Sequence, residues 1–272
     1  MSVEEKMNVD FCLLIPYYNN FEGLIESLKS VIYPEDKFLI LVIDDGSVQP
    51  LEIEKIKKEI GEKKALTILH NEQNMGITKT LNKGLAWIEN NIIAKYIARL
   101  DCGDICSADR FIIQVNYMNT HPEIGLMGSW CRFIDEKSKL TYSYKSPSQH
   151  TSILKGMYFK NVFMHASVIF KTNLLKQIGY YPVDFEYAED YAFFWKLILV
   201  NQSFVIDKYL ITCKVNRNGI SFKNKGKQLV ARWKVVKAFS TKPLLCVAAF
   251  LRLMLLFILP KELLLQLKRM KG

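Results

Sequence analysis

The sequence predicts a doubly wound α/β domain with a mostly parallel central sheet and helices on both faces. Two observations predict this class. Short apolar runs alternate with helical patterns, and each run is apolar throughout instead of alternating with polar residues. Uninterrupted apolar runs are typical of strands buried on both faces, as in parallel sheets. The length of 272 residues suits one large domain with an appendage.

The first part of the chain supplies four predicted strands and three predicted helices. The strands are 11–15, 38–43, 66–69 and 96–100, and the helices between them are 22–32, 51–60 and 76–89. Ligands of such sheets bind beyond the carboxyl ends of the strands. We therefore expect the polar residues after the first, second and fourth strands to converge on one rim.

The second part of the chain mixes helices and strands. We expect a helix at 108–119, two short strands around Gly128, a strand within 162–170, a helix at 172–178 and a helix at 190–200. The helix at 190–200 is apolar on nearly all sides, so we expect it to be buried.

Basic residues concentrate near the C-terminus. The segment 214–272 holds 14 Lys or Arg residues and one acid, Glu262, which is more than the whole net charge of +10. The rest of the chain is slightly acidic, which argues against a nucleic-acid-binding protein. A basic amphipathic helix is predicted after residue 226, with Leu229, Trp233 and Val236 on one face.

The segment 244–259 is apolar except for Arg252. It is short for a helix that spans a bilayer. One interpretation is a helix that lies in the membrane interface, with flanking lysines on anionic headgroups. The other is a helix packed against the rest of the protein.

Several common sites are excluded or disfavoured by the sequence. The six cysteines show no paired spacing, so we expect reduced thiols in the cytoplasm. The N-terminal ten residues are polar and acidic, unlike a signal peptide. No glycine-rich phosphate-binding motif follows the first strand. A bound nucleotide would therefore be held by carboxylates, backbone groups and a metal.

Acidic pairs end two of the predicted strands. Asp44 and Asp45 follow the second strand, and Asp101 and Asp104 follow the fourth. Two carboxylates on one rim can hold a divalent cation, which prefers hard oxygen ligands. The alternative for Asp104 is that it only caps the next helix.

A third acidic pair, Glu189 and Asp190, stands at the start of a predicted helix. Acids are favoured there by capping and by the helix dipole. The functional interpretation is a general base that removes a proton from a sugar hydroxyl. His165 lies in an apolar run, where a histidine is usually a core group, although an acceptor-site role stays open.

A series of motifs resembles one family over roughly residues 11–221. They are LLIPYYNN (13–20), LVIDDGS (41–47), HNEQNMGITKTLNKGL (70–85), YIARLDCGDICSADRF (96–111), HPEIGLMGSW (121–130), MHASVIF (164–170), AEDYAFFWKL (188–197) and CKVNRNGIS (213–221). In this order they resemble the family-2 glycosyltransferases with the GT-A fold, especially bacterial enzymes of surface-polysaccharide assembly.

The resemblance implies a domain organisation. It implies a GT-A domain over 1–225, with a nucleotide-binding half at about 1–110, an acceptor half at about 111–225 and a membrane-associating helical tail at 226–272.

The resemblance also implies roles for individual residues on the donor side. Pro16, Tyr17 and Asn19 would border the nucleotide. Asp45 would face its base, with Asp44 in support.

Further roles concern the diphosphate and the transfer. Asp101 would lie near the ribose or diphosphate, and Asp101 and Asp104 would bind Mn²⁺ or Mg²⁺. Asp190 would be the base of an inverting transfer, and Glu189 would orient the base or the acceptor. Lys214 would meet the diphosphate as a point charge.

Two positions depart from the family pattern. The family commonly has an acid at the position of Gly103, so the metal role moves to Asp104. Relatives often carry an Arg-x-His segment where this chain has Lys214-Val215-Asn216.

The expected function is hexose transfer from a UDP- or dTDP-sugar to a lipid-linked glycan of O-antigen, capsule or lipopolysaccharide. The protein would work in the cytoplasm, on the inner face of the membrane, and it would not bind nucleic acid. The oligomeric state stays open. A nucleotidyltransferase on a related fold, or a non-catalytic membrane-associated relative, are the alternatives.

Overall fold

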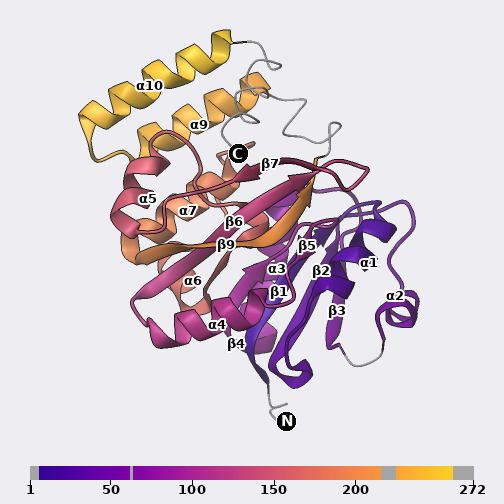
Figure 1. Cartoon of the computed structure of the whole chain (residues 1–272). Helices are drawn as coiled ribbons and strands as arrows, with labels where there is room; N and C mark the ends of the chain where they lie inside the picture. The colour runs from indigo at the N-terminus through magenta and orange to yellow at the C-terminus, as the bar shows by residue number, and fades with distance from the viewer. Residues whose placement is uncertain (1–5, 62–63, 216–224, 260–272) are drawn as a thin grey trace.

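The computed structural model describes residues 6–61, 64–215 and 225–259. Their strands form a single nine-stranded sheet with the order β3-β2-β1-β4-β8-β6-β9-β5, and β7 pairs with β6 (Figure 1). The strands are β1 Met7–Tyr17, β2 Phe38–Asp44, β3 Leu66–His70, β4 Ile92–Arg99, β5 Ile105–Cys106, β6 Ile124–Ile134, β7 Leu140–Tyr144, β8 Ile169–Lys171 and β9 Gln202–Lys214. The α-helices are α1 Phe21–Ser30, α2 Ile53–Ile60, α3 Ile77–Asn91, α4 Arg110–Thr120, α5 His150–Met157, α6 Leu175–Ile178, α7 Glu189–Val200, α9 Lys225–Phe239 and α10 Pro243–Ile258.

The first half of the sheet is parallel, as the apolar runs predict. β1 pairs in parallel with both β2 and β4, and β2 pairs in parallel with β3. Tyr17 pairs with Asp44 at the ends of β1 and β2, so the two strands stop at the same level. The predicted convergence of the polar strand ends on one rim is thereby confirmed for these two strands.

Helices cover both faces of this half. Cys12 and Leu14 of β1 are buried in one apolar cluster together with α3 and α7, whereas Phe11, Leu13 and Ile15 are buried in a second cluster with α1 and α4. Successive side chains of a strand point to opposite faces. A strand that is covered on both faces must therefore be apolar throughout.

The second half of the sheet is mixed and differs from the predicted elements. β6 is one continuous strand through Gly128, and it pairs in parallel with β9, which the apolar pattern did not reveal. The strand predicted within 162–170 is wrong over most of its length. A 3-10 turn at His165–Ser167 precedes the short strand β8. The turn forms because both the backbone N–H and the hydroxyl of Ser167 donate to the carbonyl of Met164.

The C-terminal helices α9 and α10 lie together at one end of the molecule, beside α7 and α5 (Figure 1). Leu229 and Val236 of α9 are buried, and Trp233 stacks at a tilt on Phe250 of α10 with ring centroids 4.9 Å apart. The apolar face of α9 is thus used inside the protein. Across the described ranges, no helix is both long and apolar enough to cross a bilayer.

The outer face of α10 differs from that of an ordinary surface helix. Ala249 and Leu253 are buried, and Arg252 donates from Nη1 to the carbonyl oxygen of Phe159. The single charged residue of α10 therefore points toward the protein. Large apolar side chains face outward: Leu244, Val247, Leu251, Met254, Leu255, Phe257 and Ile258.

Candidate active site

The ends of β1 and β2 are joined by side-chain hydrogen bonds. The backbone N–H of Asn19 donates to Ser47 Oγ at 3.0 Å, and Val48 N donates to Asn19 Oδ1 at 2.9 Å. Asn19 has a positive φ of 49°, which asparagine tolerates better than most residues. Pro16 and Tyr17 lead into this loop, so the predicted nucleotide-bordering residues lie together.

Asp44 is a buried structural acid. Its carboxylate accepts from the backbone N–H of Ser47 at 3.0 Å and of Leu51 at 3.1 Å, and it is 1% exposed. His70 Nδ1 lies 3.5 Å from Asp44 Oδ2. Asp44 therefore shapes the loop after β2.

Asp45 holds a second loop in place. Its carboxylate accepts from Asn71 Nδ2 and Met75 N, both at 2.8 Å, and from Gly76 N at 3.0 Å. Gly76 precedes α3, so Asp45 binds the N–H groups at the start of that helix. Asp45 is 6% exposed. The loop that it fixes forms one wall of the rim.

Asp101 lies beyond β4 and is paired with a buried arginine. Arg99 is fully buried, and its guanidinium bonds Asp101 Oδ1 and, at 2.9 Å each, the carbonyls of Leu14 and Leu100. Arg99 Nε donates to His165 Nε2 at 3.2 Å. Desolvation raises the pKa of Asp101, but the charge of Arg99, a smaller contribution from His165 and the hydrogen bond from Arg99 together outweigh this effect, so the net pKa is lowered. Asp101 is thus an ionised carboxylate with 46% of its side chain exposed.

His165 belongs to this network and stays neutral. Burial, followed by the positive charge of Arg99, lowers the pKa of His165 to about 3. Tyr181 Oη lies 2.8 Å from His165 Nε2. The core interpretation of His165 agrees with this position, because the ring lies behind Arg99 and is bonded to interior groups.

Asp104 lies on the same turn, with a different environment. Cys213 Sγ donates to Asp104 Oδ2 at 3.0 Å. Burial and then the nearby charge of Asp101 raise the pKa of Asp104 to about 7. Gly103, between Asp101 and Asp104, has a φ of +99°, which residues with a side chain rarely adopt. Its N–H donates to Ser27 Oγ at 2.9 Å. Glycine adopts such a conformation without the strain that a side chain would add.

The turn at residues 101–104 offers a cation two carboxylates, those of Asp101 and Asp104. Among residues 6–61, 64–215 and 225–259, no group of three or more His, Cys, Asp or Glu side chains could hold a metal. Asp101 is ionised and accessible, and a cation between Asp101 and Asp104 would relieve their repulsion. The donor set therefore fits a hard divalent ion whose other ligands come from a phosphorylated substrate.

Glu189 and Asp190 begin α7 and face the same space. Asp190 accepts from Asn161 Nδ2 at 2.9 Å and from its neighbour Tyr191 N at 2.6 Å. Burial raises the pKa of Asp190. Burial, followed by the charge of Asp190, raises the pKa of Glu189 to about 7. The charge of Asp101 acts on both acids in the same direction. The acids of the two halves therefore lie close enough for their charges to interact.

Lys214 reaches the rim from the end of β9. Its Nζ forms an ion pair with Glu26 of α1, and both side chains are about two-fifths exposed. The predicted side chain is at the rim, but it is paired with an acid in this structure.

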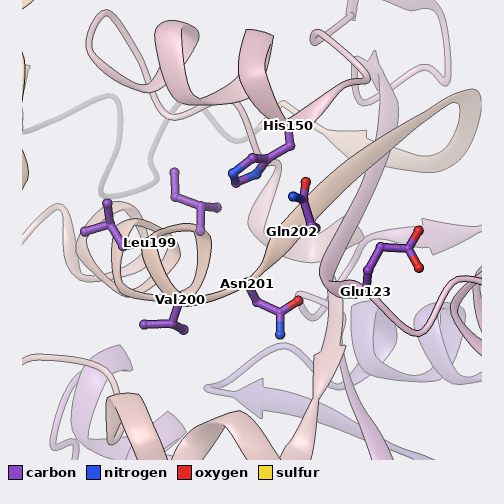
Figure 2. Close-up of a pocket in the computed structure, with 7 residues that line it drawn as sticks. Glu123, His150, Leu199, Val200, Asn201 and Gln202 are labelled. Atoms are coloured by element: carbon purple, nitrogen blue, oxygen red, sulfur yellow. The ribbon is translucent and has the colours of Figure 1, made fainter.

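A separate hollow of about 390 Å³ lies at the opposite end of α7 (Figure 2). His150, Glu123 and Asn201 are among the residues that line it. Because Glu189 and Asp190 are at the first turn of α7 and this hollow is at the last, it is not part of the acidic cleft.

Several residues of the cleft were missed by sequence reasoning. Arg99 carries a signal that was available, because a charge within a buried strand requires partners. Asn161, which bonds Asp190, follows α5 without any motif of its own. Ser27 and Asn71 act through side-chain hydrogen bonds that no spacing reveals. Ser27 Oγ accepts from the N–H of Gly103 and donates to the carbonyl of Asp104, and Asn71 Nδ2 donates to Asp45 and Thr80.

Two solved structures resemble the protein over most of its length. The complex of S. aureus TarS 1-349 with UDP-GlcNAc gives a TM-score of 0.67 at 18% identity, over 90% of this chain and 72% of that one. Mannosyltransferase PcManGT from Pyrobaculum calidifontis, with GDP-Man and Mn²⁺, gives 0.66 at 16% identity, over 90% and 70%. A longer TarS chain is covered over 41% of its length. These likenesses confirm the GT-A-like α/β fold.

Sequence comparison identifies the family. The amylovoran biosynthesis glycosyltransferase AmsE of Erwinia amylovora is 31% identical over 193 residues, which are 69% of each chain. The UDP-Gal:alpha-D-GlcNAc-diphosphoundecaprenol beta-1,3-galactosyltransferase of Escherichia coli is 26% identical over 175 residues, or 64% of this chain and 60% of that one. A family model for glycosyl transferase family 2 matches residues 12–178. That match extends over more than half of the chain, and the protein therefore belongs to glycosyl transferase family 2.

Proposed function

We propose that this enzyme transfers a hexose, with inversion, from a nucleotide-diphosphate sugar to a lipid-linked glycan of a cell-surface polysaccharide. A UDP-sugar is favoured as donor, and a dTDP-sugar is the second choice. The observation that supports the proposal is that the charge of Asp101, at the end of β4, helps to raise the pKa of both Glu189 and Asp190, at the start of α7. The names of relatives support the substrate classes, since one concerns amylovoran biosynthesis and another a diphosphoundecaprenol acceptor.

The donor would bind across the ends of β1, β2 and β4. The base would lie against Pro16, Tyr17 and Asn19 and the loop fixed by Asp45. The diphosphate would lie near Asp101, with Lys214 exchanging Glu26 for a phosphate oxygen. Known complexes of similar folds contain UDP-GlcNAc in one case and GDP-Man with Mn²⁺ in another.

Mn²⁺ or Mg²⁺ would be held by Asp101 and Asp104 together with the diphosphate. When bound, such an ion neutralises negative charge that develops on a diphosphate leaving group. Asp101 contributes a permanently ionised oxygen because Arg99 is bonded to it.

Asp190 would act as the base. Its carboxylate would take the proton of the attacking hydroxyl as the hydroxyl oxygen bonds to the anomeric carbon and the bond to the diphosphate breaks. Asn161 and the backbone of Tyr191 hold the carboxylate in one orientation. Glu189 would orient the acceptor or share the proton.

The outer face of α10 would bind an anionic bilayer from its cytoplasmic side. It exposes large apolar side chains, and Leu251 is 62% exposed. The neighbouring exposed cations are Lys234, Lys237 and Lys242, and no Asp or Glu occurs between Asp207 and Glu262. Apolar surface flanked by lysines is the pattern that anionic membrane surfaces attract.

The first test is donor binding followed by turnover. Thermal shift of the full chain would be measured with UDP, dTDP, GDP and CMP, each with Mn²⁺, Mg²⁺ or EDTA. We expect UDP with a metal to raise the Tm most, because a ligand selective for the folded state stabilises it. Labelled UDP-hexoses would then be incubated with membrane lipid extracts, and the anomeric configuration of the product determined by NMR.

Each outcome of this test has a definite meaning. A metal-dependent shift with UDP, release of UDP and an inverted product support the proposal. Retention of configuration contradicts the inverting mechanism. Nucleotide binding without transfer supports the non-catalytic alternative, and release of pyrophosphate supports the nucleotidyltransferase alternative.

The membrane contact is tested without deleting buried parts of α9. Leu244, Leu251 and Leu255 would be changed to Ser, and co-sedimentation with vesicles containing anionic or only neutral lipid would be measured. We expect binding to the anionic vesicles to fall, since each exposed leucine loses apolar contact with the bilayer. Ile93→Ser, at a similarly exposed site on β4, is the matched control. Equal loss in the control would contradict the contact.

A further inference from the structure

The guanidinium of Arg99 is held from several sides. Arg99 ends β4 and is fully buried. Its Nη1 donates to the carbonyls of Leu14 and Leu100, at 2.9 Å each, and its Nη2 donates to Asp101 Oδ1. Its Nε donates to His165 Nε2 at 3.2 Å. Each nitrogen of the planar guanidinium therefore has a partner, and the orientation of the group is fixed.

His165 is held in turn by Tyr181. Tyr181 Oη lies 2.8 Å from His165 Nε2, the nitrogen that accepts from Arg99. An arginine Nε always carries a hydrogen, so His165 Nε2 must accept and the ring hydrogen is on Nδ1. The Tyr181 hydroxyl then also donates to Nε2. The two neighbours together fix both the place and the tautomer of the His165 ring.

Tyr181 is anchored on two helices. Its backbone N–H donates to Asn82 Oδ1 of α3 at 2.9 Å, and Asn82 Nδ2 donates to its carbonyl at 2.8 Å. Its ring stacks on Phe193 of α7, with ring centroids 4.1 Å apart. Tyr181 is 2% exposed. The chain of contacts that ends at Asp101 therefore starts from two buried helices.

The two carboxylate oxygens of Asp101 have different surroundings. Oδ1 accepts from Arg99, whereas Oδ2 accepts no hydrogen bond from residues 6–61, 64–215 or 225–259. The side chain of Asp101 is 46% exposed. A half-exposed aspartate can turn about its side-chain bonds, and a bond to a fixed guanidinium removes this freedom. Oδ2 is therefore the oxygen that is left for a ligand, and it is held in one place.

We propose that Arg99, His165 and Tyr181 are positioning residues that hold Asp101 in the orientation in which Oδ2 binds the divalent cation of the donor diphosphate. This inference rests on the proposed donor site. Partners behind a metal ligand raise metal affinity because they orient the ligand before the ion arrives. Tyr181 and His165 would act only through Arg99, and Arg99 only through Asp101.

Binding of Mn²⁺ tests the inference apart from turnover. Mn²⁺ would be titrated into the full chain in the presence of UDP, and free Mn²⁺ measured by electron paramagnetic resonance. His165→Leu leaves Arg99 Nε without its acceptor, and we expect Mn²⁺ to bind about tenfold more weakly, as is usual when a partner of a metal ligand is lost. His165→Gln should recover part of the affinity, because its side-chain oxygen can accept from Arg99.

A milder variant keeps the packing of the core. Tyr181→Phe removes one hydroxyl and leaves the ring on Phe193. We expect it to weaken Mn²⁺ binding by about threefold, the effect of one lost hydrogen bond that acts through two others. The same titration with UDP measures it.

Two variants elsewhere match these changes. His150, beside the last turn of α7, accepts at Nδ1 from the backbone N–H of Ser203 at 3.2 Å, so His150→Leu removes a comparable histidine. Tyr158 Oη accepts from the backbone N–H groups of Thr241 and Lys242, at 3.1 Å each, so Tyr158→Phe removes a comparable hydroxyl. Both controls should lower the Tm and leave the affinity for Mn²⁺ unchanged.

The dependence of turnover on Mn²⁺ separates positioning from loss of folded protein. For His165→Leu we expect a higher Mn²⁺ concentration at half-maximal rate and a kcat near that of the wild type once Mn²⁺ is saturating. A variant that is only less well folded would lose the same factor in rate at every Mn²⁺ concentration.

Several results would overturn the inference. They are equal Mn²⁺ affinity in His165→Leu and the wild type, equal losses in His165→Leu and His150→Leu, and a hydrogen on Nε2 of His165 in NMR spectra of its ring nitrogens. If the wild type with UDP binds no Mn²⁺, the positioning role fails, and a metal-independent transfer would leave the proposed function standing. If the variants lose Mn²⁺ affinity while the wild type transfers no sugar, the proposed function fails and the positioning role stands.

Discussion

Two pairs of neighbouring acids, Asp44-Asp45 and Glu189-Asp190, occupy similar places in the sequence but different chemical situations. Asp44 and Asp45 stand at the end of strand β2, and Glu189 and Asp190 stand at the start of helix α7. The carboxylates of Asp44 and Asp45 accept five hydrogen bonds between them, four of which come from backbone N–H groups. Asp190 accepts two, and burial raises the pKa of both acids of its pair.

The difference in hydrogen bonding indicates two roles: one pair holds loops in place, and the other can exchange a proton. An acid whose carboxylate accepts several backbone N–H groups holds the loops that carry those groups. An acid that is buried with few donors retains its proton at higher pH, which is what a base that works near neutral pH requires. The first pair should therefore control stability and the second pair turnover.

The largest expected effect is on turnover by Asp190→Asn. The amide has the size of the carboxylate but cannot accept the proton of the attacking hydroxyl, so kcat should fall by about 10²–10⁴-fold. UDP release measured with donor and lipid-linked acceptor checks this. Binding of UDP should be unchanged, and a variant with normal turnover would show that Asp190 is not the base.

Asp45→Ala should have the next largest effect, and on stability. The change leaves the N–H groups of Met75 and Gly76 and the amide of Asn71 without their acceptor. Losing such bonds costs about 1–3 kcal/mol for each unsatisfied buried group, so we expect a loss of about 3 kcal/mol or more. Urea unfolding measures it, and Asp109→Ala, at an exposed position before α4, is the control. If Asp45→Ala unfolded at the same urea concentration as the wild type, Asp45 would not stabilise the loop before α3.

The sequence predicted the elements of the first half of the chain better than those of the second half, for a physical reason. The predicted runs 11–15, 38–43 and 96–100 are buried on both faces of the sheet, and each ends at polar residues. β9 alternates between buried and exposed residues, for example Asp207 and Lys208 beside buried Ile206, so no such run marks it. The strand predicted within 162–170 is wrong over most of its length because the N–H and the hydroxyl of Ser167 donate to the carbonyl of Met164 and form a turn.

Side chains whose role depends on a partner far away in the sequence could also not be predicted. Asn161 follows α5 and donates to Asp190 of α7, and the charge of Arg232 in α9 acts on the same carboxylate, so both effects need distant segments to pack together. Their sequence neighbours contain no motif, because the chemistry depends on contacts between distant segments. Arg99 is different, since a lone charge in the apolar run YIARL is by itself a sign of a buried polar network.

The pH dependence of kcat provides a smaller effect. The base must be ionised, and the pKa of Glu189, coupled to Asp190, is raised to about 7. We expect kcat to rise with pH through about 7 and then level off. A kcat that does not change with pH above pH 5 would show that the pKa values of Glu189 and Asp190 are not raised. The proposed difference in role between this pair and Asp44-Asp45 would then be lost.

The smallest effect, and the sharpest test of the contrast, is expected for Glu189→Gln. With one acid removed, Asp190 no longer shares a proton with a like charge, so the rise in kcat should move to lower pH.

The folded-state pKa of Glu189 lies above its ordinary value of 4.5, so the folded protein disfavours the ionised form. The wild type therefore loses stability as pH rises from about 4.5 to about 7, and the variant avoids this loss. Thermal unfolding should show Glu189→Gln to be more stable than wild type at pH 8 and equal to it at pH 4. Equal stability at both values, with an unmoved pH profile, would mean that Glu189 is only a helix-start acid that faces water.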